Sequence, residues 1–275
     1  MRRGLFTALL VASAVVVGTF LLLPIVALLL DVPRGRLLDA LASDAAVDAL
    51  RVTAKTNVIA NVLIVLLGTP TAYLLATKRF RGRSLAVTLV ELPLVLPPAV
   101  AGVGLLAAFG SLGLLGGTFD RLGVTVAFTE TAVVLAVAFV ASPFYVRTAI
   151  AAFEALDESL LDAARTLGAR PARVFFRVAL PLAAGGLGAG MALAFARGLG
   201  EFGATIMFAG SLRGVTQTLS LAVYEQFDVD FDAALSIGAL LVVVSAFLLL
   251  AIKVLPAWTR SPSTSLIGFA RSPST

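Results

Sequence analysis

Residues 154–181 read EALDESLLDAARTLGARPARVFFRVALP and lie between two long apolar runs. Acidic residues in the first turns, Arg165 near the end and Gly168 after it are typical of a helix that stops at a glycine with positive φ. The stretch therefore predicts a short amphipathic helix over residues 154–168 that docks on another surface and does not cross a membrane. Periodicity alone leaves a solvated loop as the alternative. Apolar residues recur at spacings of three and four, at Ala155, Leu156, Leu160, Ala163, Ala164 and Leu167.

The same stretch has a specific spacing. Asp162-Ala163-Ala164 is followed by three residues and Gly168, then by nine residues and Val178-Ala179-Leu180-Pro181. This pattern resembles the EAA signature of the permease subunits of ATP-binding-cassette importers, with Asp162 in place of the usual Glu and Val178 in place of Ile. The resemblance implies a type I permease fold and a cytoplasmic coupling helix that binds a separate ATPase subunit. The coupling residues that it implies are Glu154, Asp157, Asp162, Ala163, Ala164, Arg165, Gly168, Arg170 and Pro181.

The composition is typical of proteins that cross a membrane several times. Hydrophobic residues make up 59% of the 275 residues, charged residues make up 13%, and the mean hydropathy is +1.02. The sequence contains no cysteine and no histidine, so we expect no disulfide, no metal site and no catalytic thiolate or imidazole. The net charge of +5 does not predict nucleic-acid binding, because the basic residues flank apolar runs instead of lining one face.

Six apolar runs are each long enough to cross about 30 Å of hydrocarbon. The first is longer than the apolar part of a secretory signal, so we expect a retained helix. The third is interrupted by Pro93, Pro97 and Pro98. The prediction is an all-α membrane protein with one helix and an outside loop in residues 1–50, a permease core of five helices in 51–257 and a disordered tail in 258–275. The six runs cover residues 5–30, 52–77, 85–109, 131–152, 181–207 and 233–255.

Basic residues predict the orientation of these helices. If the N-terminus is inside, most of the 21 Lys and Arg residues lie next to the inner side, including the cluster Lys78, Arg79, Arg81 and Arg83. The excess of positive charge on cytoplasmic loops therefore predicts that both termini and residues 154–181 lie in the cytoplasm of a cell-membrane protein. Residues 110–129 and the acidic segment after the fifth run are then outside. We interpret the acidic segment as a solvated loop or as a docking surface for an external partner. Its acidic residues are Glu225, Asp228, Asp230 and Asp232.

The fifth run contains two charges in an apolar setting. Arg197 and Glu201 are four residues apart and can pair on one face of a helix, whereas an unpaired charge in hydrocarbon is costly. At 100° per residue, Gly190 and Thr205 fall on the same face. We interpret this face as the lining of a path, with the pair either shaping it or touching a passing anion, and helix packing is the alternative for the glycine. An arginine of the 154–181 stretch is a candidate partner for Glu91. The candidate pathway or gate residues are Gly190, Arg197, Glu201, Thr205, Glu91, Pro97 and Pro98.

Several segments between residues 50 and 255 resemble the molybdate and tungstate branch of these permeases. Sulfate and thiosulfate permeases share parts of the pattern and are the alternative. The resemblance implies import of a tetrahedral oxyanion by alternating access, a homodimer, two ATPase subunits, and an extracytoplasmic binding protein that carries most of the selectivity. Donors for the anion are available at Thr205, Ser211, Thr216, Gln217 and Thr218. The matching segments are Gly200-Glu201-Phe202-Gly203-Ala204-Thr205, Thr216-Gln217-Thr218-Leu219, Leu92-Pro93-Leu94-Val95-Leu96-Pro97-Pro98 and Gly68-Thr69-Pro70.

The sequence lacks a phosphate-binding loop of the form Gly-x4-Gly-Lys-Ser/Thr. Its lysines are Lys55, Lys78 and Lys253, and none follows a glycine. We therefore expect no ATPase site and no cofactor in this chain, with ATP and Mg bound by the partner subunit. A secondary transporter would show repeated halves and mid-membrane carboxylates, and a membrane enzyme would need catalytic His, Cys or acid clusters. The sequence favours neither of these two classes.

Overall fold

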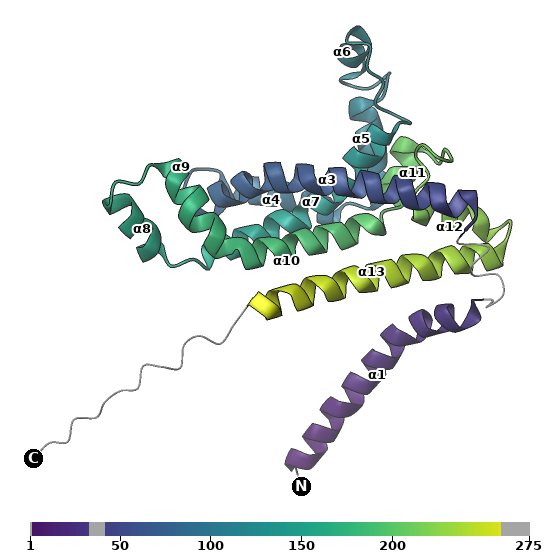
Figure 1. Cartoon of the computed structure of the whole chain (residues 1–275), viewed down its shortest axis with the longest axis horizontal. Helices are drawn as coiled ribbons and strands as arrows, with labels where there is room; N and C mark the ends of the chain where they lie inside the picture. Colours follow the sequence, from purple (N-terminus) through teal and green to yellow (C-terminus); the bar gives the residue numbers. More distant parts are fainter. Residues whose placement is uncertain (1, 33–41, 260–275) are drawn as a thin grey trace, which may run out of the picture.

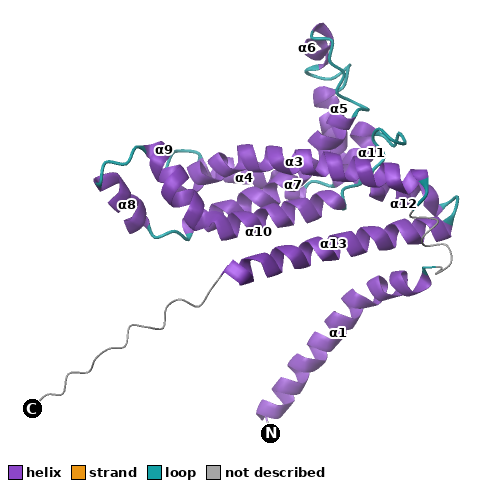
Figure 2. Ribbon diagram, in the orientation of Figure 1, coloured by secondary structure: helices purple, strands orange, loops and turns teal. Residues whose placement is uncertain are grey.

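The computed structural model describes residues 2–32 and 42–259, and it contains helices and no strands over these residues (Figures 1 and 2). A π-helical turn, Phe175–Ala179, directly precedes α10. The predicted tail lies outside the described residues from residue 260 on. The α-helices are α1 (Arg2–Asp31), α3 (Asp44–Thr77), α4 (Arg83–Val95), α5 (Pro98–Phe109), α6 (Gly116–Arg121), α7 (Glu130–Glu154), α8 (Glu158–Thr166), α9 (Pro171–Val174), α10 (Leu180–Leu199), α11 (Gly203–Ala209), α12 (Leu219–Phe227) and α13 (Phe231–Thr259).

Helix α7 is the centre of the bundle and contacts α3, α4, α10 and α11. Glycines allow the close approach of α3 and α10 to α7, as is common where helices pack inside a membrane. A Cβ on Gly68 would lie 2.9 Å from the Tyr145 ring, and a Cβ on Gly190 would lie 3.2 Å from the Tyr145 carbonyl oxygen. The Tyr145 hydroxyl is buried and lies 2.5 Å from the hydroxyl of Thr69. Tyr145 therefore sits where three helices meet.

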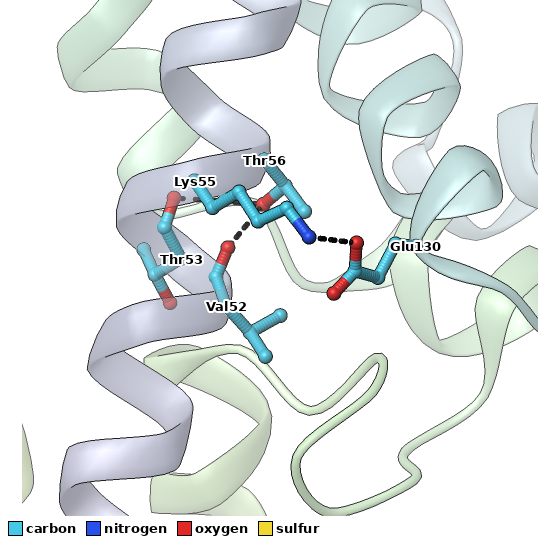
Figure 3. Close-up of polar contacts among 5 residues, drawn as sticks. All are labelled: Val52, Thr53, Lys55, Thr56 and Glu130. Atoms are coloured by element: carbon cyan, nitrogen blue, oxygen red, sulfur yellow. Dashed lines mark hydrogen bonds and ion pairs between the residues drawn. The ribbon is translucent and has the colours of Figure 1, made fainter.

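An ion pair joins α3 to the first residue of α7. Lys55 Nζ lies 2.5 Å from Glu130 Oε2, and both side chains are partly exposed (Figure 3). On the next residue of α3, the buried Thr56 hydroxyl donates to the Val52 carbonyl at 2.7 Å. Lys55 is thus paired with α7, and Thr56 is satisfied within α3.

Helix α3 begins earlier than the predicted run. Its residues 44–50 were expected in an outside loop, but Ser43 caps the helix by accepting a hydrogen bond from the Ala46 backbone N–H at 3.3 Å. Ala46 and Ala49 are buried against Leu219 and Ile237. This packing extends the helix by two turns and places the predicted boundary at residue 50 inside it.

The third predicted span is two helices and not one. α4 and α5 meet at an angle of 114°, and α5 points away from the bundle (Figure 1). Leu96 and Pro97 have extended ψ angles of 131° and 132° because each precedes a proline, whose ring disfavours a helical conformation at the residue before it. Pro98 then begins α5, where its missing N–H costs nothing. The prolines therefore break the span instead of only bending it.

The fifth predicted span also ends early. α10 stops at Leu199, three residues are non-helical, and α11 begins at Gly203. The glycines Gly198, Gly200 and Gly203 lower the helix propensity of this segment. The projection that placed Gly190 and Thr205 on one face of a continuous helix is therefore wrong beyond Gly200.

Four helical segments pass a length and hydropathy test for a membrane span, and the bent α4–α5 pair makes a fifth. The four segments are Gly4–Asp31, Asp44–Thr77, Glu130–Glu154 and Pro171–Leu199. Phe231–Phe247 in α13 is a shorter apolar segment. α1 contacts α13 and is almost fully exposed along its described side chains. The six predicted apolar runs are thus all helical, although two of them are broken.

Gly198 provides a test of the packing between α10, α3 and α7. A Cβ on this residue would overlap Asn57 Oδ1 and lie 2.8 Å from Val137 Cγ1, so Gly198→Ala should destabilise the detergent-solubilised protein by about 1–3 kcal/mol. Thermal unfolding measures this loss. Gly188→Ala on the same helix is the control, because no atom lies within 4 Å of its added Cβ. Equal melting temperatures for the two variants would contradict the packing.

Candidate functional site

The predicted functional residues lie at two places in the bundle (Figure 1). We call one the α8 end, which comprises α8, α9 and the turn between α3 and α4. We call the other the α12 end, which comprises α11, α12 and the loop between them. The predicted coupling residues lie at or near the α8 end, and most of the predicted pathway residues lie toward the α12 end.

Helix α8 is closed at both ends by local hydrogen bonds. The Asp157 carboxylate accepts from the Ser159 backbone N–H at 2.9 Å. Hydrogen bonds from Ser159, first from its side chain and then from its backbone, lower the pKa of Asp157. Gly168 has φ +81°, its N–H donates to the Arg165 carbonyl at 2.9 Å, and the Ala169 N–H donates to the Ala164 carbonyl at 3.0 Å. These two bonds are the Schellman arrangement, which confirms the predicted glycine stop.

Helix α8 has apolar residues on two faces. Leu161 is 4% exposed and packs into the core with Ala164 and with Leu156, which lies just before the helix. The predicted single stripe is therefore wrong, because it assumed a helix from residue 154, whereas Glu154 ends α7 and α8 starts at Glu158. An outward stripe remains, formed by Leu160, Ala163 and Leu167, of which Leu167 is 88% exposed. This stripe is available to a partner.

A polar cavity of about 640 Å³ separates α8 from the turn between α3 and α4. Arg83 spans one side of it: its Nη2 lies 2.5 Å from Glu154 Oε1 and its Nε donates to the Leu75 carbonyl at 2.6 Å. Arg165 pairs with Asp162 of the same helix at 2.6 Å. These pairs fix the side chains of three predicted coupling residues. Arg170 is the exposed N-cap of α9, and Pro181 lies exposed in the first turn of α10.

The chain runs from α8 into α10 through an aromatic cluster. Phe175 begins the π-helical turn, and its ring centroid lies 4.8 Å from Tyr73 and 6.4 Å from Phe153. Tyr73 and Phe153 pack edge to face at 5.2 Å. π-Helical turns are rare and often occur at functional sites. The π-helical turn before α10 is thus packed against α3 and α7 through Phe175.

Arg197 and Glu201 form the predicted ion pair at the far end of α10. Arg197 Nη2 lies 2.7 Å from Glu201 Oε2, and the Glu201 side chain is 1% exposed. The other carboxylate oxygen accepts from the Ala204 N–H at 2.8 Å, which satisfies an N–H in the first turn of α11. The Ser220 hydroxyl donates to the Glu201 carbonyl at 2.7 Å. The pair and its neighbours therefore connect the end of α10 to the start of α11 and to α12.

The two broken spans meet at this point. A Cβ on Gly203, the first residue of α11, would lie 2.8 Å from Pro98 Cβ at the start of α5. A Cβ on Gly102 of α5 would lie 2.6 Å from the Ala204 carbonyl oxygen. Pro97 and Pro98 are themselves exposed. The structure thus brings the proline break and the glycine break together, although they are about 100 residues apart in sequence.

Three of the other predicted anion donors, Ser211, Thr216 and Gln217, form hydrogen bonds within the chain. The buried Thr216 hydroxyl oxygen accepts from the Leu212 N–H at 2.9 Å. Gln217 is buried and its amide donates to Glu225, to which Ser211 also donates at 3.2 Å. These bonds fold the loop between α11 and α12 and occupy Glu225, one of the predicted outer docking acids. Among the predicted donors, Thr205 has a fully buried hydroxyl with no hydrogen-bond partner.

The remaining predicted residues have different surroundings from those expected. Glu91 pairs with Arg147 of α7, with 3.6 Å between Oε1 and Nε, and not with an arginine of the 154–181 stretch. Gly190 is buried against α7, so its surroundings are those of a packing position. Asp230 accepts from the Ala233 N–H at 3.1 Å and so stabilises the start of α13.

Sequence reasoning missed a row of polar residues on α3. Thr53, Asn57 and Asn61 are buried and four residues apart. Thr53 accepts from the Leu219 N–H at 2.8 Å, and the Asn57 amide donates to the Phe195 carbonyl of α10 at 3.0 Å. Their helical spacing inside an apolar run was the available signal. Thr53 and Asn57 thus tie α3 to α12 and α10, while the Asn61 amide donates to Asn57 Oδ1 within α3 at 3.0 Å.

Comparison with known proteins gives consistent matches. Residues 59–259 match the family described as binding-protein-dependent transport system inner membrane component. The chain is 45% identical over 233 residues to the molybdenum transport system permease protein ModB of Mycobacterium tuberculosis, covering 85% of this chain and 88% of that protein. It is 35% identical over 254 residues to the sulfate transport system permease protein CysT of Salmonella typhimurium, covering 91% and 92%. A chain of a bacterial alginate ABC transporter, crystallised with an alginate-bound periplasmic protein, matches with a TM-score of 0.77 at 15% identity over 94% of this chain and 96% of that one.

Removing one member of the buried ion pair tests its structural role. Arg197→Ala leaves the Glu201 carboxylate buried and uncompensated, so we expect the variant to lose about 3–5 kcal/mol of stability or to fail to accumulate. Thermal unfolding of purified protein measures the loss. The double variant Arg197→Met with Glu201→Gln should recover most of it, because both charges are gone and the glutamine oxygen can still accept from Ala204. A stable Arg197→Ala single variant would refute this role.

Proposed function

The chain belongs to the family of binding-protein-dependent transport system inner membrane components, and we propose that it is the membrane-spanning subunit of an ATP-driven importer for molybdate or a similar tetrahedral oxyanion. The observation that carries the substrate class is the 45% identity to a molybdenum permease over most of both chains. The identity to the sulfate permease, over a similar length, is 35%. Sulfate is therefore the second candidate.

The α8 end is the proposed contact with the ATPase subunit. Leu160, Ala163 and Leu167 present an apolar stripe outward, while Leu161 anchors the same helix to the core. An amphipathic helix of this kind fits a groove on a partner surface. ATP and Mg are then bound by that partner, since this chain has no phosphate-binding loop. This subunit is a transport component and has no catalytic site of its own in the proposal.

Charge supports the proposed orientation. The turn between α3 and α4 has four basic residues next to α8, and cytoplasmic loops have such an excess. The α8 end and both termini are then cytoplasmic, and the α12 end faces the extracytoplasmic binding protein. The basic residues of this turn are Lys78, Arg79, Arg81 and Arg83.

A homodimer completes the proposed path. α5 leaves the bundle (Figure 1), and its apolar side chains Val100 and Val103 are each 54% exposed. Pro97 and Pro98, at the start of α5, are also exposed. A second copy would cover these surfaces and enclose a path between the two chains. One chain then supplies half of the path.

Alternating access follows from the packed connection between α8 and α10. ATP binding closes the partner dimer and draws the two α8 helices together. Because Phe175 packs in one cluster with Tyr73 and Phe153, a displacement of α8 is passed to α10 and to the break that Glu201 holds. In the proposed cycle this movement opens the path outward, and ATP hydrolysis reverses it.

ATPase activity of the assembled complex tests the proposed substrate. The chain is purified in detergent with its ATPase subunit and combined with binding protein loaded with molybdate, tungstate or sulfate. We expect molybdate and tungstate to raise the ATPase rate and sulfate to leave it unchanged. Stimulation by sulfate alone would support the proposed importer but show that its substrate is sulfate. Failure of the chain to bind any ATPase subunit would reject the importer.

Gly168 tests the proposed coupling through α8. A valine at φ +81° costs about 1 kcal/mol or more of backbone strain, so Gly168→Val should displace the end of α8 and reduce transport per ATP hydrolysed. Uptake of labelled molybdate and phosphate release in proteoliposomes measure this ratio. Gly123→Val is the matched control, because Gly123 has φ +67° and open space around it but lies in the loop between α6 and α7, outside the α8 end. An unchanged ratio in Gly168→Val would contradict coupling through this helix.

A further inference from the structure

The ion pair between Arg147 and Glu91 lies well inside two of the helices that cross the bundle. Arg147 is seven residues before the end of α7, about 10 Å along its axis, and Glu91 is eight residues after the start of α4, about 12 Å along it. The sequence pattern predicts Glu91 in the path but does not mark Arg147 as a path residue. The pair lies in the half of the bundle nearer α8.

This pair is exposed, unlike the other ion pair inside the helices. The side chains of Arg147 and Glu91 are 69% and 38% exposed, whereas those of Arg197 and Glu201 are 26% and 1% exposed. The contact is also longer, at 3.6 Å against 2.7 Å. An exposed charge at this depth is costly in lipid and is normally found facing a bundle interior or a water-filled cavity. We therefore expect water or an anion to contact the Arg147 guanidinium.

A polar strip leads from the α8 end to this pair. Ser84, Thr88 and Glu91 recur at spacings of four and three on α4, so they share one face, and Ser84 and Thr88 are exposed. On α7, Arg147 and Glu154 are two turns apart. Glu154 pairs with Arg83 of α4 beside the 640 Å³ cavity. Two Arg–Glu pairs thus connect α4 and α7. In the pair near α8 the arginine is on α4, and in the deeper pair the arginine is on α7.

The opposite side of the same seam is apolar. There, a groove of about 430 Å³ between α3, α4 and α7 is lined by Leu67, Leu89 and Phe139 among others. Leu89 follows Thr88 directly, so the two residues lie at the same depth on different faces of α4. The contrast shows that the polar strip belongs to one side of the seam and is not a general property of α4.

We propose that the polar side of the α4–α7 seam is the hydrated inner half of the oxyanion path, and that Arg147 is a transient binding station for the anion before it leaves. The guanidinium offers five N–H donors, and its Nε lies 3.6 Å from Glu91 Oε1, an ion pair that is longer than a hydrogen bond. A planar fork of donors suits a tetrahedral oxyanion. Glu91 limits the affinity, because a site on a path must release what it binds. This proposal rests on the proposed importer.

Thiol labelling tests whether the seam is wet. The chain contains no cysteine, so Arg147→Cys, Thr88→Cys and Leu89→Cys each introduce a unique thiol. The probe is a cationic, membrane-impermeant methanethiosulfonate, applied to the assembled complex in nucleotide-free proteoliposomes from the side of the ATPase. We expect residues 88 and 147 to react at least about tenfold faster than residue 89, because only they face water. Equal, slow labelling at all three positions would overturn the proposal by placing the seam in lipid.

Transport tests the role of Arg147 in binding. Arg147→Gln should lower molybdate uptake by about tenfold, with partial recovery in Arg147→Lys, because the lysine keeps the charge but not the fork of donors. Molybdate should also slow labelling of Thr88→Cys in the presence of Arg147 and not with Arg147→Gln. Lys55→Gln is the control, since the Lys55–Glu130 pair has similar exposure but lies at the other end of α7 (Figure 3). Uptake at the wild-type rate by Arg147→Gln would refute the proposal that Arg147 binds the anion.

The two proposals fail in different ways. If loaded binding protein stimulates ATPase activity but the seam labels no faster than Leu89→Cys, the importer stands and the inner path lies elsewhere. If loaded binding protein never stimulates ATPase activity, the importer itself fails, whatever the labelling shows. Unchanged thermal unfolding of Arg147→Gln, measured in parallel, excludes misfolding as the cause of lost uptake.

Discussion

The carboxylate of Glu201 stabilises the point at which α10 ends inside the bundle. A helix that ends there leaves backbone groups without partners, and hydrocarbon offers none, so protein groups must supply them. Glu201 does this with one oxygen on the Ala204 N–H and the other on Arg197, while its own carbonyl accepts from Ser220. Interrupted backbone within a membrane is tolerated only where it is buried in protein or lines a cavity. In the break after α10, Glu201 is buried, Phe202 is half-buried and Gly200 is exposed.

The second break depends on the first. Pro98 lies against Gly203 and Gly102 lies against Ala204, so the start of α5 is seated on the start of α11. α5 can leave the bundle at 114° to α4 because this contact fixes its base. The three residues between α10 and α11 are held by the Glu201 contacts, so α10 is connected to α5 through α11. In the proposed importer, this contact is what transmits movement from the α8 end to the surface shared with a second copy.

Local features of this chain could be predicted from its sequence, and contacts between distant segments could not. The positive φ of Gly168 and the Arg197–Glu201 pair depend on residues within four positions of each other, and both predictions are confirmed. The break at Gly200 was missed, because the apolar pattern continues through it and the group that satisfies the broken end is a side chain. The partner of Glu91 was missed for the other reason: Arg147 is on a helix 56 residues away, and periodicity carries no information on which helices meet.

The fate of the predicted anion donors bears on where selectivity lies. Thr216, Gln217 and Ser211 are spent on folding the loop before α12, and the Arg197 guanidinium is committed to a carboxylate that is almost fully buried. A group already bound within the chain cannot discriminate between oxyanions of similar shape without unfolding its own surroundings. Thr205 keeps a hydroxyl without a partner, but this hydroxyl is fully buried. In the proposed path, the exposed guanidinium of Arg147 beside Glu91 would favour an anion over a cation without distinguishing molybdate from sulfate. We infer that this subunit selects for charge, and that the choice among tetrahedral oxyanions is made before the ion reaches it.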